Sequence, residues 1–355
     1  MPPFLQFLIR RLLVIPVSFI IITMVLYAGV MLTPPETRAD LYFPPTGAHL
    51  TDEQVARIYG NIIEKYHLRD PYPIQYAYWL KSLIQSKWGY SPTLNDNVLP
   101  ALLRRTPATA ELTLYSILFF VPLGLVSGVL AGWRQNRAFD NTFRFLAFVA
   151  TSFPPFILAL LFLSIFYVNL HWFAPGRIDM MYGFQIADPG FRTFTGMFTI
   201  DSLLNGRFDI FIDSLRHLAM PVFTLSIFHW ATLGRITRST IILERHRDYI
   251  MAAQSRGLTD RRVLWRHVFW NTLAPSFTSM TLSVASLVTG VFVVEIIYNI
   301  RGVSDIMVRA MQMVPDAPAA LGFSLYSTLI VLLLMFILDI LQAIFDPRIR
   351  EDLFK

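Results

Sequence analysis

Six stretches without any charged residue, made mostly of apolar side chains, divide the chain. They cover residues 12–32, 112–133, 145–170, 218–234, 271–294 and 317–338. A helix needs about 20 apolar residues to cross the hydrocarbon core of a bilayer. Each stretch is close to that length, so the pattern predicts an all-α, polytopic membrane helix bundle with six transmembrane helices.

The first stretch follows the basic pair Arg10-Arg11, as a secretory signal peptide also would. A signal peptide has a shorter apolar core and a cleavage site of small residues directly after it. Here the apolar run continues to Leu32 and ends in Thr33-Pro34-Pro35. We therefore predict an uncleaved N-terminal transmembrane helix within residues 1–33.

Composition supports the same class of protein. Only 15% of the 355 residues are charged and the mean hydropathy is +0.50, whereas a soluble domain carries about 25% charged residues. The net charge of +6 is not a nucleic-acid signal, because most Lys and Arg residues flank the apolar stretches. The chain contains no cysteine, which excludes disulfides and thiolate metal sites.

The distribution of Lys and Arg predicts the orientation. Six crossings place both termini on one side of the membrane. If that side is the cytoplasm, the cytoplasmic segments hold 16 Lys and Arg against 8 acidic residues, and the longer external segments hold 14 against 16. Because cytoplasmic loops are enriched in Lys and Arg, we predict that both termini are cytoplasmic.

The basic segment 244–275 is the most informative part of the chain. Residues 248–256 lack Pro and Gly and should form a helix, which Gly257 would end at a positive φ. Thr259-Asp260 offers a cap for a second short helix, which should end or bend at Pro275. The predicted helix–Gly–helix elbow is too polar to cross lipid and too apolar to lie free in water. It indicates a docking surface for a protein partner; the alternative is a basic loop that serves only topology.

The amino-acid sequence of this elbow, DYIMAAQSRGLTDRRVLWRHVFWNTLAP, resembles the EAA-type coupling loop of bacterial ABC importer permeases. It is most similar to the branch with dipeptide, oligopeptide and nickel permeases. Ala252, Ala253 and Gly257 occupy the Ala-Ala and Gly positions of that motif. Met251 replaces its Glu, and Leu273-Ala274-Pro275 replaces its Ile-x-Leu-Pro ending, which fits the peptide branch better than the sugar importers.

Other segments between about residues 10 and 350 resemble the same family. They are a TPEQ-like helix start at 51–54, a DP-x-P-x-QY turn at 70–76, an R-x-PATxEL segment at 104–112, a G-x-V-x-VE segment at 290–302 and a DPR-I-R ending at 345–350. Arg301 departs from the family pattern, which has Pro at that position, and this leaves the local turn open.

The resemblance implies the type I ABC importer permease fold with a small helical extracytoplasmic subdomain. The implied division is an N-terminal transmembrane helix at 1–33, the subdomain at 34–110, a transmembrane permease core at 111–345 and a cytoplasmic tail at 346–355. The permease core is expected to contain an external loop at 171–217 and a cytoplasmic coupling loop at 236–272.

The two external segments differ in pattern. In the first, Thr51 to Gln54 reads as a capping box that opens a helix to about His67, and an aromatic-rich helix follows at 74–87. Its aromatic cluster could bind peptide side chains, or could simply pack the subdomain or lie at the level of the lipid headgroups. The second segment, 171–217, is rich in Gly, Pro and Phe and should form turns, with a short helix near 210–216.

Four residues within or beside the spans are candidates for a translocation path or gate. Pro154-Pro155 should bend the third span, either to line a path or as a static kink. Ionisable groups inside a membrane usually face the bundle interior or a cavity. His229 could touch substrate or rest neutral against a helix carbonyl. Glu295 could contact a cationic substrate or a gate, or pair with Arg301 or Arg309.

For the elbow, the resemblance implies contact with a cytoplasmic ATPase. The residues assigned to this coupling are Asp248, Tyr249, Ala252, Ala253, Arg256, Gly257, Leu258, Arg262 and Pro275. No metalloprotease, nucleophile-elbow or nucleotide-binding motif occurs in the sequence, so we expect no catalytic, metal or cofactor site in this chain. ATP and Mg²⁺ are expected on partner ATPase subunits.

The sequence therefore predicts a permease subunit of an ATP-driven ABC importer in a prokaryotic plasma (inner) membrane. The resemblance implies a second permease, two cytoplasmic ATPases and an extracytoplasmic solute-binding protein as partners, and peptides or a related small solute as cargo. The alternative is a secondary transporter or channel that needs no ATP. Six spans without an evident internal repeat argue against it.

Overall fold

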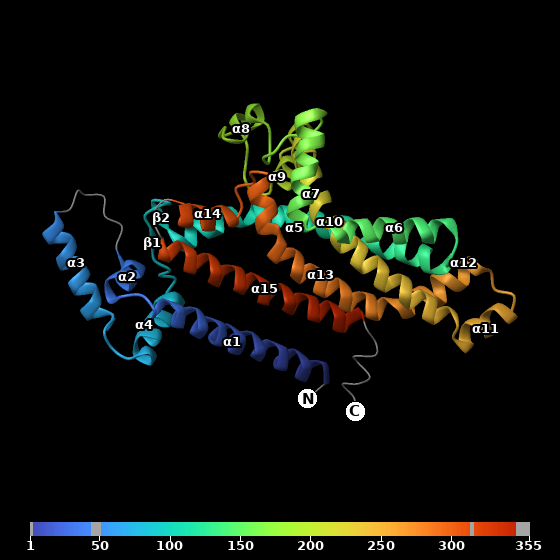
Figure 1. Ribbon diagram of the computed structural model, residues 1–355, viewed down its shortest axis with the longest axis horizontal. Helices are drawn as coiled ribbons and strands as arrows, with labels where there is room; N and C mark the ends of the chain where they lie inside the picture. The colour runs from blue at the N-terminus through green and yellow to red at the C-terminus, as the bar shows by residue number, and fades with distance from the viewer. Residues whose placement is uncertain (1–2, 44–50, 313–315, 346–355) are drawn as a thin grey trace. The chain divides into compact units, whose positions relative to one another are not determined.

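The computed structural model describes residues 3–43, 51–312 and 316–345. Within these residues the chain is almost entirely helical, as Figure 1 shows. A short antiparallel pair, β1 (Tyr90–Ser91) and β2 (Asp96–Asn97), interrupts the helices. The all-α fold predicted from the sequence is confirmed, while the ending at 346–350 lies outside the described residues.

The helices fall into two length classes. The long ones are α1 (Pro3–Val30), α5 (Val98–Trp133), α10 (Phe208–Arg245), α13 (Phe269–Ile297) and α15 (Ala317–Phe345). The short ones are α2 (Pro35–Ala39), α3 (Asp52–Lys65), α4 (Tyr72–Ile84), α6 (Ala138–Ser152), α7 (Pro155–Phe162), α8 (Met180–Ile186), α9 (Phe198–Leu204), α11 (Asp248–Ser255), α12 (Asp260–Arg262) and α14 (Ser304–Gln312). One 3-10 turn, η1 (Asp40–Tyr42), and two π-helical turns, η2 (Leu163–Asn169) and η3 (Val263–Val268), extend neighbouring helices.

Each long helix contains a segment that is long and apolar enough to cross a membrane. The pair formed by α6 and α7 with η2 makes a sixth crossing if it is counted as one span, but it is bent by 97°. Pro154 and Pro155 cause the break, because a proline ring excludes the preceding residue from helical backbone angles. Phe153 is accordingly extended, with φ −108° and ψ 129°. The predicted bend is therefore a complete break between two helices.

Several helices extend beyond the predicted spans. The sequence predicts a short helix at 210–216, a span at 218–234 and the start of a loop at 236. All of these residues belong to the single helix α10. The helix and the span are present, but the predicted boundaries between these segments are wrong, because charged side chains such as Asp213 and Arg216 keep residues out of lipid without ending a helix. The segment 171–217, expected to form turns, also contains α8 and α9.

The chain forms two compact units. Of the described residues, the first contains 108–300 with 3–8 and 334–345, and the second contains 9–43, 51–107, 301–312 and 316–333. This division differs from the linear one expected from the sequence, because the segment 34–110 packs with α1 and with the 301–333 segment.

In the first unit, α5 and α10 approach each other closely through glycines. Gly124, Gly128 and Gly132 follow one another at four-residue spacing in α5 and face α10. A Cβ atom added to Gly128 would lie 2.6 Å from the carbonyl oxygen of Gly234. Small residues at this spacing let membrane helices pack backbone against backbone. α13 runs beside α10 on the same unit (Figure 1).

In the second unit, aromatic side chains hold α4 against α1. Tyr27 of α1 stacks on Trp79 of α4 with 4.8 Å between ring centroids, and Thr23 Oγ1 lies 2.8 Å from the hydroxyl oxygen of Tyr76. Tyr76 and Trp79 are buried. These two aromatics therefore pack the subdomain, as the second interpretation of the cluster proposed. The capping box at Thr51 is also present.

Candidate functional site

The elbow predicted within 244–275 is present and joins α10 to α13 (Figure 1). α11 ends in a Schellman motif, in which Gly257 has φ +78°. The Gly257 amide donates to the carbonyl of Gln254 at 2.9 Å, and the Leu258 amide donates to the carbonyl of Ala253 at 3.3 Å. This pairing satisfies carbonyls that a helix end leaves free. Gly257 thus fixes the direction of the chain at the elbow, as predicted.

The second arm of the elbow differs from the prediction. Thr259 takes the predicted N-cap position, and its carbonyl accepts the Val263 amide at 3.0 Å. From there the chain continues through α12 and η3 directly into α13, with Pro275 inside that helix. Of the two outcomes expected at Pro275, an end or a bend, the end is wrong because the helix continues through this residue. A membrane helix tolerates an internal proline where neighbouring groups satisfy the freed carbonyl, so the second arm is continuous with a membrane span.

The inner face of the elbow is anchored in the first unit. Ile250 and Ala253 of α11 and Val263, Leu264 and Val268 of the second arm are buried together against Val129 of α5 and Ile241 of α10, with Leu258 partly buried at the edge. Burying such side chains stabilises each by about 1.5–3 kcal/mol relative to exposure. Both arms are therefore fixed to the helix ends that they connect.

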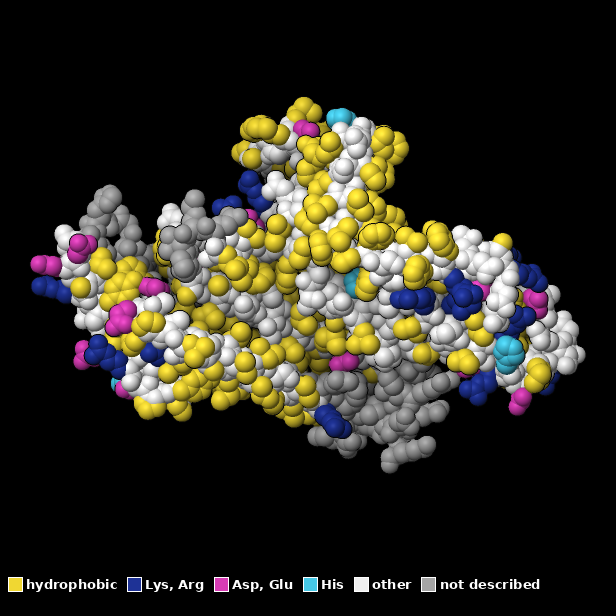
Figure 2. Space-filling model, in the orientation of Figure 1, with side chains coloured by type: hydrophobic (Ala, Val, Ile, Leu, Met, Phe, Trp, Pro, Cys, Tyr) yellow, Lys and Arg dark blue, Asp and Glu magenta, His cyan; other side chains and the backbone are white. Residues whose placement is uncertain are grey.

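The outer face of the elbow carries most of the other predicted coupling residues. Exposed side chains belong to Asp248, Tyr249, Met251, Ala252, Arg256 and Arg262. Met251 is 53% exposed. Figure 2 shows Lys and Arg side chains gathered over α11 and α12. An exposed apolar strip bordered by basic groups is typical of a docking surface.

Tyr249 links the start of α11 to both flanking helices. Its hydroxyl donates to Glu244 Oε2 at 2.7 Å and accepts from Asn271 Nδ2 at 2.9 Å. Partial burial raises the pKa of the Tyr249 hydroxyl, so the group remains a donor at neutral pH. The predicted coupling residue Tyr249 thus fastens the elbow to its two helices.

A buried ion pair near the same end of α10 was not recognised in the sequence. Asp140 of α6 is fully buried and accepts from Arg238 Nε at 2.5 Å and Nη2 at 2.8 Å. The amide of Asn136 donates to the same carboxylate at 2.9 Å. From the sequence, Arg238 is predicted only to be one of the basic residues that set the orientation in the membrane. The pair connects α6 to α10 within the first unit.

The four candidates for a path or gate have different surroundings. Pro154 is exposed and Pro155 half-buried at the break between α6 and α7. His229 is buried with its ring 5.5 Å from that of Phe120. Glu295 is fully buried, and Thr109 Oγ1 donates to it at 2.5 Å.

Another buried carboxylate that the sequence did not single out organises the external part of the first unit. Glu111 of α5 accepts from Arg177 Nη2 at 2.6 Å, and from both the amide and the hydroxyl of Thr199 at 2.7 Å. The Arg177 guanidinium also lies 3.9 Å from the ring centroid of Phe198. Glu111 therefore ties two distant points of the 171–207 segment to α5.

We expect Glu111→Gln to loosen this attachment. Removing the charge weakens hydrogen bonds that are worth about 1.5–3 kcal/mol when one partner is ionised. Amide hydrogen exchange around Thr199 should accelerate about tenfold or more. Asp209→Asn is the matched control, because the Arg207–Asp209 pair is exposed and such pairs contribute about 0–1 kcal/mol. Equal protection in wild type and Glu111→Gln would contradict the assignment.

Comparisons with known proteins agree with this architecture. The profile of the family described as "Binding-protein-dependent transport system inner membrane component" matches residues 121–351. The chain is 30% identical to the di/tripeptide transport system permease protein DppB of Pseudomonas aeruginosa, over 98% of this chain and 99% of the relative. It is also 30% identical to the dipeptide permease DppB of Escherichia coli K12 over the same shares.

A third relative is the oligopeptide transport system permease protein AppB of Bacillus subtilis, 32% identical over 81% of this chain and 84% of the relative. The family match and the near full-length similarity to permeases agree with the membrane-crossing helices. The chain therefore belongs to the family of inner membrane components of binding-protein-dependent transport systems, as a non-catalytic permease subunit of an ABC importer.

Proposed function

We propose that this permease imports short peptides that an extracytoplasmic binding protein delivers. Three of its relatives are named as permeases for di/tripeptides, dipeptides or oligopeptides, and two of them match over 98% of the chain. Membership in a binding-protein-dependent family argues against the alternative of a secondary transporter or channel. Specificity would then be shared with the separate binding protein.

The orientation proposed from the charge distribution puts both termini and the elbow in the cytoplasm. The elbow joins two helices of membrane-crossing length at their basic end. The segment around Glu111 and Arg177 would then face the outside, where a binding protein docks.

We propose that the outer face of the elbow docks on one of two cytoplasmic ATPase subunits. The observation that carries this is the division of α11 into two faces: Ile250 and Ala253 are buried in the permease, while Met251 and Ala252 are exposed. Because α10 leads into α11 and η3 leads into α13, a displacement of the elbow is passed on to two spans as a rigid movement.

ATP and Mg²⁺ belong on the ATPase partners in this mechanism, and a second permease completes the membrane part. Closure of the ATPases around ATP would move the two elbows together and reorient the spans. Within this chain, the break at Pro154-Pro155 and the buried residues His229 and Glu295 stay the candidates for the path or its gate.

The docking face predicts the effect of Ala252→Glu, because Ala252 is exposed on α11. A carboxylate on the exposed apolar strip would lose its hydration in the interface without gaining a partner of opposite charge, which costs several kcal/mol. ATPase subunits should therefore fail to co-purify with the permease, and peptide-stimulated ATP hydrolysis should be lost.

Ser239→Glu is the matched control, because Ser239 is exposed on α10 away from α11. This variant should retain its ATPase subunits. Normal attachment in Ala252→Glu would show that the outer face of α11 is not the docking surface.

A further inference from the structure

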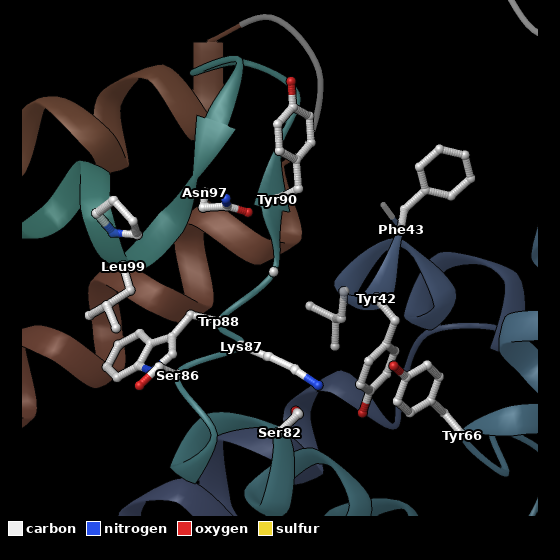
Figure 3. Close-up of a pocket in the computed structure, with 13 residues that line it drawn as sticks. Tyr42, Phe43, Tyr66, Ser82, Ser86, Lys87, Trp88, Tyr90, Asn97 and Leu99 are labelled. Atoms are coloured by element: carbon white, nitrogen blue, oxygen red, sulfur yellow. The ribbon is translucent and has the colours of Figure 1, made fainter. Parts of the chain in front are cut away.

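The second unit contains a cavity of about 370 Å³ that none of the functions above uses. Its 13 lining residues come from η1, the end of α3, the end of α4 and the segment that leads through β1 and β2 into α5 (Figure 3). Five of them are aromatic: Tyr42, Phe43, Tyr66, Trp88 and Tyr90.

The charge of this cavity has one sign. Lys87 is the one cationic residue among those that line it, and none of the lining residues is acidic. Figure 3 shows the Lys87 ammonium group turned toward Ser82 and the pair of Tyr42 and Tyr66. Those two rings are stacked with 3.9 Å between their centroids. Burial raises the pKa of the Tyr42 hydroxyl, which stays a neutral donor. The cavity therefore suits an anionic group.

Contacts within the second unit locate the cavity relative to two helices of membrane-crossing length. Trp88 and Tyr42 pack against a cluster that includes Tyr27, one turn from the end of α1, and Leu325, two turns from the start of α15. The ring of Trp88 also lies 6.3 Å from that of Tyr326. Since α1 and α15 are membrane spans, the cavity lies where their apolar segments end. Tyr, Trp and Lys at this level meet lipid headgroups.

An apolar track continues from the cavity along α5. Leu99 and Pro100 line the cavity, and Leu103, one turn further along α5 toward its uncharged stretch at 112–133, is 54% exposed. On the other side, Ile84 at the end of α4 is 78% exposed beside Ser86 and Lys87. Such exposed side chains are ordinary against acyl chains and unfavourable against water.

We propose that this cavity binds the phosphate headgroup of an anionic glycerophospholipid, with Lys87 as its ion-pair partner and an acyl chain along Leu99 and Leu103. On the topology proposed above, the lipid comes from the outer leaflet. A peptide carboxylate would also fit the charge of Lys87. The lipid is favoured because the cavity lies at headgroup depth and opens onto an exposed apolar track.

The test is native mass spectrometry of the purified permease complex with phosphatidylglycerol, phosphatidylethanolamine or glycerol 3-phosphate added. Lys87→Gln should lower retention of phosphatidylglycerol at least about fivefold, the equivalent of about 1 kcal/mol for one basic residue at an anionic surface. Lys81→Gln is the control, because Lys81 is exposed on α4 but does not line the cavity.

A second pair of variants adds charge without changing the backbone. Ser86 lines the cavity and has φ +61°, a conformation that Asp and Asn tolerate. Ser86→Asp should therefore repel the phosphate, whereas Ser86→Asn should retain the lipid. The headgroup alone, as glycerol 3-phosphate, should be retained poorly because it lacks the acyl chain.

Three results would overturn the proposal. One is phosphatidylglycerol retention that is equal in wild type, Lys87→Gln and Ser86→Asp. Another is retention of glycerol 3-phosphate as strong as that of the lipid, which would indicate a free phosphate ester as ligand. The third is displacement of the lipid by a peptide with a free carboxyl terminus but not by its amide, lost in Lys87→Gln, which would assign the cavity to peptide.

Discussion

Replacing Gly257 with proline should abolish peptide-stimulated ATP hydrolysis by the assembled transporter. Proline fixes φ near −65° and has no amide hydrogen, whereas Gly257 has φ +78° and its amide donates to the Gln254 carbonyl. A proline that conflicts with the backbone in this way costs about 3 kcal/mol or more. The Schellman motif would be lost, and α11 would no longer present Ala252 in a fixed direction. We expect at least about a tenfold loss of stimulation.

Gly257→Asn is the matched control at the same position. Asparagine tolerates the left-handed conformation, and an added Cβ atom at Gly257 meets nothing within 4 Å. This variant should retain most of the stimulation. If proline and asparagine had the same effect, or if proline had none, the elbow would not be the mechanical link.

Gly128→Leu should prevent the first unit from folding. The first added atom would lie 2.6 Å from the Gly234 oxygen and 2.8 Å from the Thr237 Cβ atom, both in α10. Overpacking of a well-packed core usually costs about 1–3 kcal/mol. Here one of the clashing atoms is a backbone oxygen, which cannot move to another rotamer as a side chain can. The loss of folding free energy should therefore reach or exceed the upper end of that range. Fluorescence-detected size-exclusion chromatography should show little monodisperse protein.

Gly29→Leu serves as the comparison for this prediction. Gly29 lies in the membrane span α1, is exposed, and has nothing within 4 Å of an added Cβ atom. Its yield and melting temperature should match those of wild type. A Gly128→Leu protein with the same elution profile as Gly29→Leu would show that α5 and α10 do not pack through these glycines.

The elbow could be predicted because its signals are local. A glycine after nine residues without Pro or Gly specifies a Schellman ending through the backbone alone, and Gly257 behaves accordingly. The same reasoning found the capping box at Thr51 and the break at Pro154-Pro155. In each case the decisive property belongs to one or two residues and needs no distant partner.

The features that the sequence did not reveal depend on residues far apart in the chain. Asp140 and Arg238 are 98 positions apart in the sequence, and Glu111 and Thr199 are 88 positions apart. Separations of this length form no recognisable sequence motif. The continuity of α13 through Pro275 was missed for a related reason, because neighbouring helices decide whether a proline ends a helix. The four-residue spacing of Gly124, Gly128 and Gly132, by contrast, is a sequence pattern from which close packing of α5 against another helix could have been predicted.

The most direct test of the account is a cross-link from the elbow. The chain has no cysteine, so Ala252→Cys can carry a single benzophenone label on the exposed face of α11. Photolysis of the assembled complex should join this permease to an ATPase subunit. The same label at Met180→Cys, 76% exposed in α8, should not do so. A cross-link to the ATPase from position 180, or none from position 252, would contradict the proposed docking surface and its side of the membrane.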